Sequence, residues 1–275
     1  MAFRDRLNRA GDGVVAGYDR PMASIDRDRL VAYLDDYLDA RRGADYCPNG
    51  LQVEGRTEVR KVVTGVSACL ELFERAERAQ ADAVLVHHGI FWKGMPYPLT
   101  GVQFRRVESL VRSGINLVAY HLPLDRHPEL GNNALAARAF GLLDVEPFGE
   151  YEGLPVGVHG RLPEPLSPAD LAARAEEVFG QEPRAVPGGP EEIRSLGMIS
   201  GAAQQQLWDA VGLGLDAFLT GEASEWVMNV AREAGVHYLA CGHYATERLG
   251  VRALGEHLAD RFGLEVVFVD VPNPV

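Results

Sequence analysis

Cysteine, long apolar runs and positive charge are all scarce in this sequence. Its three cysteines are far apart among 275 residues, so they form neither a disulfide framework nor a C-x-x-C metal motif, which favours a reducing cytoplasm. No apolar run approaches the roughly 18 residues of a membrane span. A net charge of −12 argues against a broad surface for nucleic acid or anionic lipid, but is compatible with a small metal-lined pocket for a phosphorylated ligand.

The pattern that remains is that of an α/β protein. From Ser24 onward, short apolar strands alternate with amphipathic helices, and this repeated order predicts mostly parallel sheets flanked by helices. Residues 146–160 are the hardest to assign, and their sequence predicts only a short strand near 156–158. Residues 1–23 are polar and lack the apolar stretch of a secretory signal. We predict that they form a disordered extension with no catalytic role.

The most informative stretch is residues 81–89, an apolar strand that ends in His87, His88 and Gly89. Ligands of open α/β sheets bind beyond the carboxyl ends of such strands. Neighbouring side chains on a strand point to opposite faces, so the two imidazoles can reach two different partners. We expect each of them to bind a separate metal ion.

Two parts of the chain look like copies of one strand–helix–strand unit, the first at residues 81–121 and the second at 215–243. Each copy ends in a histidine that is followed four residues later by a carboxylate, Asp125 in the first and Glu247 in the second. We interpret this match as an internal duplication, although α/β units also resemble one another because they share a pattern. A duplicated unit would place its two ligand sets face to face across a pseudo-two-fold axis.

Five side chains could together bind two divalent ions about 3.5–4 Å apart, with open positions for water and substrate. The expected metal ligands are His87, His88, Asp125, His243 and Glu247. His243 and Glu247 share a face if their segment is helical, and a histidine at a helix start tends to stay neutral, as ligation requires. We expect Glu247 to bridge the ions and Asp125 to bind one of them. Such mixed ligation suits Zn, Fe, Mn or Ni.

Each of these residues also has a structural interpretation. A single histidine at a strand end is more often hydrogen-bonded than metal-bound, and a His–Glu pair four residues apart is often a surface contact. His121 has three open interpretations, as a ligand, as a residue that orients the ligands, or as a general acid–base. We favour the second of these.

Five separated motifs stand in the chain in this order: Asn-Gly-Leu-Gln-Val at 49–53, His-His-Gly-Ile-Phe at 87–91, His-Leu-Pro-Leu-Asp at 121–125, Thr-Gly-Glu at 220–222 and Gly-His-Tyr-Ala-Thr-Glu at 242–247. Together they resemble the signatures of the dinuclear-metal-centre hexameric proteins, also known as GTP cyclohydrolase I type 2 homologues. The resemblance covers residues 24–275 and fits the short bacterial branch of the family.

The resemblance implies a fold and an assembly. Each protomer would contain two similar, intertwined α/β lobes, the first formed by residues 24–145 together with 240–275 and the second by residues 146–239. Protomers would assemble into a toroidal homohexamer, with dimetal sites that face the internal cavity. The resemblance also implies that the five residues named above are the ligands of two divalent ions per chain.

The resemblance further implies a metal-dependent hydrolase of a nucleotide-like substrate, in which metal-activated water attacks the substrate. For cyclohydrolysis the target would be the purine imidazole carbon, with His121 or Glu222 as the catalytic proton carrier. Residues 91–97 could stack on a base or gate the site, or equally could pack or form a subunit contact. Because a glycine-rich phosphate loop is lacking, a phosphate would bind the metals or a side chain such as Lys93.

Two other functions are compatible with the same residues. One is a non-catalytic, metal-binding hexameric scaffold. The other is a metal-dependent phosphoesterase that acts on nucleotides or damaged DNA, since two-metal sites support such chemistry well. The acidic charge weighs mildly against long nucleic acid as a partner.

Overall fold

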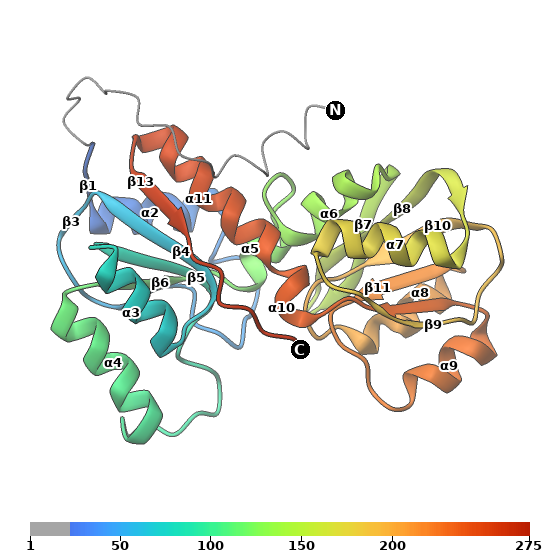
Figure 1. The fold of residues 1–275 in the computed structure, drawn as a ribbon, viewed down its shortest axis with the longest axis horizontal. Helices are drawn as coiled ribbons and strands as arrows, with labels where there is room; N and C mark the ends of the chain where they lie inside the picture. Colours follow the sequence, from blue (N-terminus) through green and yellow to red (C-terminus); the bar gives the residue numbers. More distant parts are fainter. Residues whose placement is uncertain (1–22) are drawn as a thin grey trace.

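The computed structural model describes residues 23–275. They form two α/β units, each with its own main sheet, which lie side by side along the long axis of the molecule (Figure 1). The α/β class predicted from the alternating pattern is therefore confirmed. The predicted disordered extension, residues 1–23, lies outside the described residues except for Ala23. Within the described part, no helix has both the length and the apolar character that a membrane crossing requires.

The first sheet has five strands in the order β13-β4-β5-β6-β2. They are β2 (Gly50–Val53), β4 (Lys61–Ser67), β5 (Ala83–His88), β6 (Asn116–Ala119) and β13 (Glu265–Phe268). All neighbours are parallel except β2, which pairs with β6 in the antiparallel direction. The carboxyl ends of β4, β5 and β6 therefore meet at one edge of the sheet, where ligands of such sheets bind.

The second sheet has six strands in the order β7-β8-β10-β11-β12-β9. They are β7 (Leu143–Tyr151), β8 (Leu154–Leu166), β9 (Arg184–Val186), β10 (Ile193–Met198), β11 (Ala217–Thr220) and β12 (His237–Ala240). The three central strands, β10, β11 and β12, are parallel, and antiparallel strands flank them. The short strand predicted near 156–158 is part of the long β7–β8 hairpin, whose first strand is mostly exposed and so has no apolar run to mark it. A separate two-stranded sheet pairs β1 (Ile25–Asp26) with β3 (Glu58–Val59).

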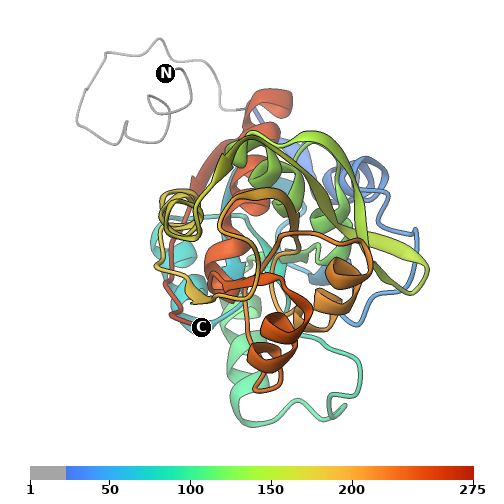
Figure 2. The same cartoon turned by 90° about the vertical axis from the view of Figure 1, so that its right-hand side faces the viewer.

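Helices cover both sheets (Figures 1 and 2). They are α2 (Arg27–Tyr37), α3 (Leu70–Arg78), α4 (Gly101–Ser113), α5 (Leu122–Arg126), α6 (Asn132–Phe140), α7 (Pro168–Phe179), the 3-10 turn η1 (Gln204–Gln206), α8 (Leu207–Gly212), α9 (Val227–Ala234), α10 (His243–Thr246) and α11 (Arg248–Phe262). In both views α4 and the loop before it lie at the lower edge of the molecule. The short helices α5 and α10 lie between the two sheets (Figure 1).

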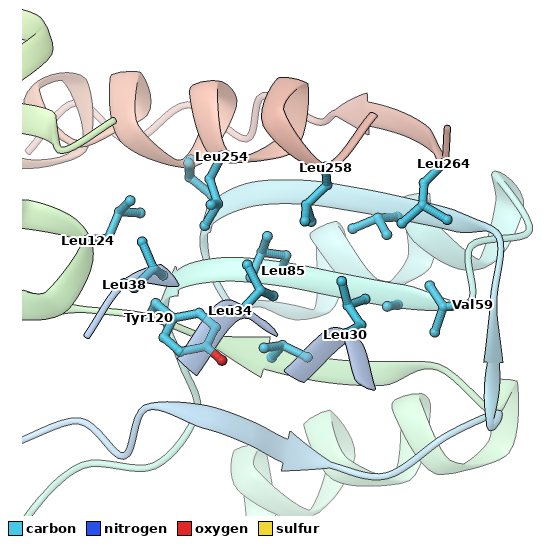
Figure 3. Packing of buried hydrophobic residues seen from close by; sticks show 14 of the residues in the cluster. Leu30, Leu34, Leu38, Val59, Leu85, Tyr120, Leu124, Leu254, Leu258 and Leu264 are labelled. Atoms are coloured by element: carbon cyan, nitrogen blue, oxygen red, sulfur yellow. The ribbon is translucent and has the colours of Figure 1, made fainter. Parts of the chain in front are cut away.

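Strand β5 is packed on both faces, as its continuous apolar sequence predicts. On one face Leu85 lies among leucines of α2 and α11, including Leu34 and Leu254 (Figure 3). On the other face Val84 and Val86 belong to a second buried cluster. Burying one such side chain stabilises the fold by about 1.5–3 kcal/mol. The strand that ends in His87 and His88 is therefore a rigid support.

The two units interpreted as copies have the same element order. The first is β5–α4–β6 and the second is β11–α9–β12, and in each the two strands pair in parallel. A short helix follows each unit, with His121 as the residue before α5 and His243 as the first residue of α10. The matching architecture agrees with the internal duplication inferred from the sequence.

Candidate metal centre

All five predicted ligands meet between the two sheets, around the carboxylate of Glu247. Its Oε1 atom lies 3.4 Å from Nε2 of His87 and 3.2 Å from Nε2 of His243. Its Oε2 atom lies 3.2 Å from Nε2 of His88. Asp125 contacts the same ring of His87, with its Oδ2 atom 3.5 Å from Nε2. Glu247 is only 2% exposed, so this is a buried cluster and not a surface contact.

His87 and His88 follow one another on β5 but reach the same carboxylate. Their rings are 4.7 Å apart and tilted by 44°, and their Nε2 atoms contact different oxygens of Glu247. Each histidine can therefore hold its own cation while Glu247 lies between them. This arrangement is compatible with the bridging position expected for Glu247.

The three histidines predicted as ligands have the other ring nitrogen occupied. Their Nδ1 atoms contact the carbonyl oxygen of Tyr120 at 3.1 Å for His87, Oγ of Ser67 at 3.3 Å for His88 and Oε1 of Glu222 at 2.6 Å for His243. Outer contacts of this kind orient histidines that bind metal through the opposite nitrogen. The imidazoles are therefore held with Nε2 directed into the centre.

Glu222 lies behind His243. Besides its contact with His243, it lines a separate cavity together with Gly221 and Gly242, whereas the cleft above the cluster is lined by other residues. A proton carrier needs to come within hydrogen-bond reach of the substrate. The position of Glu222 therefore fits a residue that orients His243 better than the catalytic role predicted from the sequence.

Asp125 is held by the first residue of α6 and by the loop after β10. Its Oδ1 accepts hydrogen bonds from Nδ2 of Asn132 and from Oγ of Ser200, both at 2.8 Å. Oδ2 is thereby left to face His87. Sequence reasoning did not find Asn132 or Ser200, because neither stands in a motif with the carboxylate that it contacts.

His121 lies beside the cluster and is paired with a carboxylate of its own. Its Nδ1 contacts Oδ1 of Asp45 at 2.8 Å, and its ring lies 5.0 Å from that of His87. Nitrogen atoms of His87, His88 and His121 lie within 4.8 Å of one another, and so do ligand atoms of His88, His243 and Glu247. The centre thus contains two overlapping groups, each able to hold one ion.

Asp45 was missed by the sequence analysis. Burial raises the pKa of its carboxyl, but His121, together with hydrogen bonds from Cys47 and Asn49, outweighs burial and lowers the pKa. Oδ1 also accepts the backbone N–H of Cys47, while Oδ2 accepts that of Leu122. The only signal in the sequence is that this aspartate shortly precedes the Cys-Pro-Asn-Gly turn.

The carboxylates dominate the electrostatics of the centre. Burial lowers the pKa of His87, but the charges of Asp125 and Glu247 outweigh it and raise the pKa to about 9. The pKa of His243 is likewise raised to about 9, because Glu247 and Glu222 outweigh its burial. Burial raises the pKa of Glu247, but the imidazoles of His88 and His87 hold it well below its ordinary value. The pKa of His88 is lowered, mainly by burial.

The sequence predicts a neutral His243 at a helix start, but the carboxylates around it oppose that effect and raise its pKa. Helix α10 has only four residues, so its dipole is small, and two carboxylates contact the imidazole. The predicted continuous helix is also interrupted, since Glu247 separates α10 from α11 with φ −105° and ψ 3°. His243 and Glu247 still contact each other, at the two ends of the single turn of α10.

The residues of the cluster fit divalent cations. Within residues 23–275, Nε2 of His87 and Oε2 of Glu247 are buried atoms whose contacts at 3.2–3.5 Å are not hydrogen bonds, and buried polar atoms without a hydrogen bond are rare in native proteins. Three imidazoles and two carboxylates are a donor set that Zn, Fe, Mn and Ni accept. The same concentration of negative charge that raises the pKa of two histidines also favours a cation.

A cleft of about 620 Å³ opens over the cluster and is lined by His88, His121, Asp125, His243 and Glu247 among others. Aromatic side chains form part of its wall, with the ring of Tyr46 at 5.7 Å from that of Trp92 and at 5.7 Å from that of Tyr151.

The side chains of the loop at residues 91–97 lie in different environments. Trp92 lines the cleft, Phe91 packs against a buried cluster of the first sheet, and Tyr97 is 99% exposed. Lys93 is exposed and is not among the residues that line the cleft. Of the residues proposed from sequence to contact a substrate here, only Trp92 is in place to do so.

Fold and site together define an α/β protein with a histidine- and carboxylate-lined centre between two sheets. The chain belongs to the Duf34/NIF3 (NGG1p interacting factor 3) family, whose family model matches residues 25–274. It is 48% identical to the GTP cyclohydrolase 1 type 2 homolog of Pseudomonas aeruginosa over 245 residues, which cover 89% of this chain and 97% of that protein. The protein of the same name from Vibrio cholerae is 45% identical over 253 residues, covering 90% and 98% of the two chains.

Solved structures agree with this assignment. The protein ybgI, described as of unknown function, superposes with a TM-score of 0.87 at 42% identity, covering 91% of this chain and 100% of that one. The protein TTHA1606 from Thermus thermophilus gives a TM-score of 0.80 at 41% identity with the same coverage. The resemblance inferred from five motifs is therefore confirmed.

Proposed function

We propose that this chain is a dinuclear metal-dependent hydrolase of a nucleotide-like substrate. The observation that carries the proposal is the convergence of three Nε2 atoms on the two oxygens of one buried carboxylate. In this proposal His87, His88, Asp125 and His243 hold the ions, and Glu247 is shared between them. When bound, two divalent ions would lower the pKa of a water molecule and polarise the electrophilic atom of the substrate.

The chain's own residues would position the substrate and move protons. His121 lines the cleft, and Asp45 holds its Nδ1, which leaves the other ring nitrogen for proton exchange with a bound molecule. Such a base with an orienting carboxylate is a common arrangement in hydrolases. We therefore keep His121 as the candidate catalytic residue, with Asp45 as its positioning residue.

The cleft also suits a base. Its volume of about 620 Å³ is within the range of small-molecule sites, and Trp92, Tyr46 and Tyr151 offer aromatic faces. Stacking of a base on such a side chain contributes about 1–3 kcal/mol. Relatives of this chain are named as GTP cyclohydrolase homologues, so GTP is the first substrate to test.

Purified protein loaded with Zn, Fe, Mn or Ni in turn is expected to convert GTP, as measured by chromatography of the products. His87→Ala is expected to reduce turnover by at least about 1,000-fold, within the range by which metal-activated water accelerates hydrolysis. His159→Ala is the control, because His159 lies outside the cluster next to Glu146. Equal turnover by the wild type and His87→Ala would refute the proposal.

A phosphoesterase acting on nucleotides or damaged DNA is the second candidate, favoured by the paired cation sites. A panel of phosphoester substrates distinguishes it from the cyclohydrolase. A phosphoesterase would hydrolyse members of the panel, and a cyclohydrolase would convert GTP only. Whichever activity is present should be lost in His87→Ala. If neither activity is found, but metal-free variants keep the cellular phenotype of the wild type, the protein is a scaffold instead.

We also propose the toroidal homohexamer that the motifs imply. It is supported by apolar side chains that are exposed on α4 and the loop before it, with Tyr97 at 99%, Val111 at 59% and Phe104 at 49%. Contiguous exposed apolar surface is typical of interfaces. A solution mass far from six times 30.0 kDa would contradict the hexamer.

A further inference from the structure

We infer that Arg106 binds a phosphate group of the ligand in this cleft and makes the site selective for phosphorylated molecules. The inference rests on the proposed function, because it assigns the anionic end of the same substrate. Arg106 lies on α4 and lines the cleft together with His88, Trp92 and the other residues of the centre. Among the described residues that line the cleft, it is the only lysine or arginine.

The guanidinium of Arg106 has no partner in the described residues. Its Nε atom is buried and makes no hydrogen bond, and none of the ion pairs within residues 23–275 includes it. Arg112, nearly two turns later on α4, pairs with Glu108 at 2.8 Å. In a chain with 39 acidic and 27 basic residues, an arginine that reaches a cleft without an acidic partner is unusual.

The position of Arg106 is fixed from the same helix. One turn earlier, Nε2 of Gln103 donates a hydrogen bond to the carbonyl oxygen of Ile90 at 2.8 Å. Ile90 follows His88 and Gly89, at the end of β5, and is itself buried. Because residues three apart share a helix face, Arg106 is held beside the histidine end of the sheet.

A phosphate satisfies these features better than a neutral ligand does. The planar guanidinium offers parallel N–H donors that match two phosphate oxygens, and a half-buried charge is costly unless it is paired. The ligand would then lie with its phosphate at α4 and its reacting part at Glu247, across the aromatic wall formed by Trp92. Lys93, the phosphate ligand suggested from the sequence, is exposed outside the cleft.

Calorimetric titration of metal-loaded protein with GTP and with guanosine tests this inference. Arg106→Gln is expected to weaken GTP binding by about 10- to 100-fold, the range for loss of a hydrogen-bonded charge, while guanosine affinity and metal content stay unchanged. Arg106→Lys should recover part of the lost affinity, since lysine keeps the positive charge but lacks the parallel N–H donors of the guanidinium. Arg105→Gln, at an exposed neighbouring position on α4, and Lys93→Gln are controls expected to bind GTP like the wild type.

Inorganic pyrophosphate separates this inference from the proposed function. An Arg106→Gln defect in pyrophosphate binding that persists in the His87→Ala background supports the phosphate site even if hydrolysis is never found. The inference is overturned if Arg106→Gln leaves GTP affinity unchanged or weakens GTP and guanosine equally. It is also overturned if the wild type binds neither GTP nor pyrophosphate. Failure of GTP turnover with this selectivity intact would count only against the hydrolase.

Discussion

Glu247→Gln is expected to lose both ions and all metal-dependent turnover, while the fold is retained. Both oxygens of this carboxylate contact imidazole nitrogens, whereas glutamine offers one acceptor and turns an NH₂ group toward the centre. The negative charge that attracts cations is also lost. We expect metal affinity to fall by more than about 100-fold. Substitution of residues that only hydrogen-bond the metal ligands typically lowers metal affinity by about 10- to 100-fold.

Elemental analysis after dialysis measures this effect, with far-ultraviolet circular dichroism as the check on folding. Glu256→Gln is the matched control, because Glu256 lies at an exposed position of α11, the helix that follows Glu247. A Glu247→Gln protein that keeps both ions would show that the centre does not need a shared carboxylate. Loss of only one ion would show that Glu247 does not bridge.

Gly201→Ala is expected to disrupt the centre without removing any ligand. Gly201 has φ +70°, and a Cβ atom there would lie 2.4 Å from Oε1 of Glu247 and 3.3 Å from Nε2 of His243. At 2.4 Å the methyl group would push the carboxylate of Glu247 away from the imidazoles that it contacts. We expect loss of at least one ion, measured by elemental analysis, together with about 1–2 kcal/mol of destabilisation from the left-handed backbone.

Gly235→Ala separates the two effects of that substitution. Gly235 has φ +73°, but among residues 23–275 no atom outside its own neighbours lies within 4 Å of the position its Cβ would take. It should therefore show a similar loss of unfolding free energy in denaturant titrations and keep both ions. The close fit of Gly201 against Glu247 is refuted if both variants lose metal equally or if neither does.

The sequence predicted the parts of the site that stand at the ends of regular elements. His87 and His88 end an apolar strand, and the repeat with its matching carboxylates pointed to Asp125 and Glu247. These signals are local, because an apolar run and a four-residue spacing are both visible without knowing the fold. The four-residue spacing places Nε2 of His243 3.2 Å from Oε1 of Glu247, although the helix expected to continue through Glu247 is interrupted at that residue.

The residues that support the site could not be found in this way. Asp45 contacts His121 across 76 positions of sequence, and Ser200 contacts Asp125 across 75. Neither residue belongs to a periodic pattern, so only the folded arrangement of two sheets brings them together. Arg106 was overlooked for the related reason that charged residues on a helix are usually solvated. Its lack of a partner among the described residues is visible only in three dimensions.

Elemental analysis of the purified wild-type protein shows whether the cluster around Glu247 holds two cations, on which the proposed hydrolase depends. The protein would be incubated in turn with Zn, Fe, Mn and Ni, dialysed, and measured against chain concentration from amino-acid analysis. We predict close to two ions per chain for at least one of these metals. A protein that retains none of them would contradict the dinuclear centre.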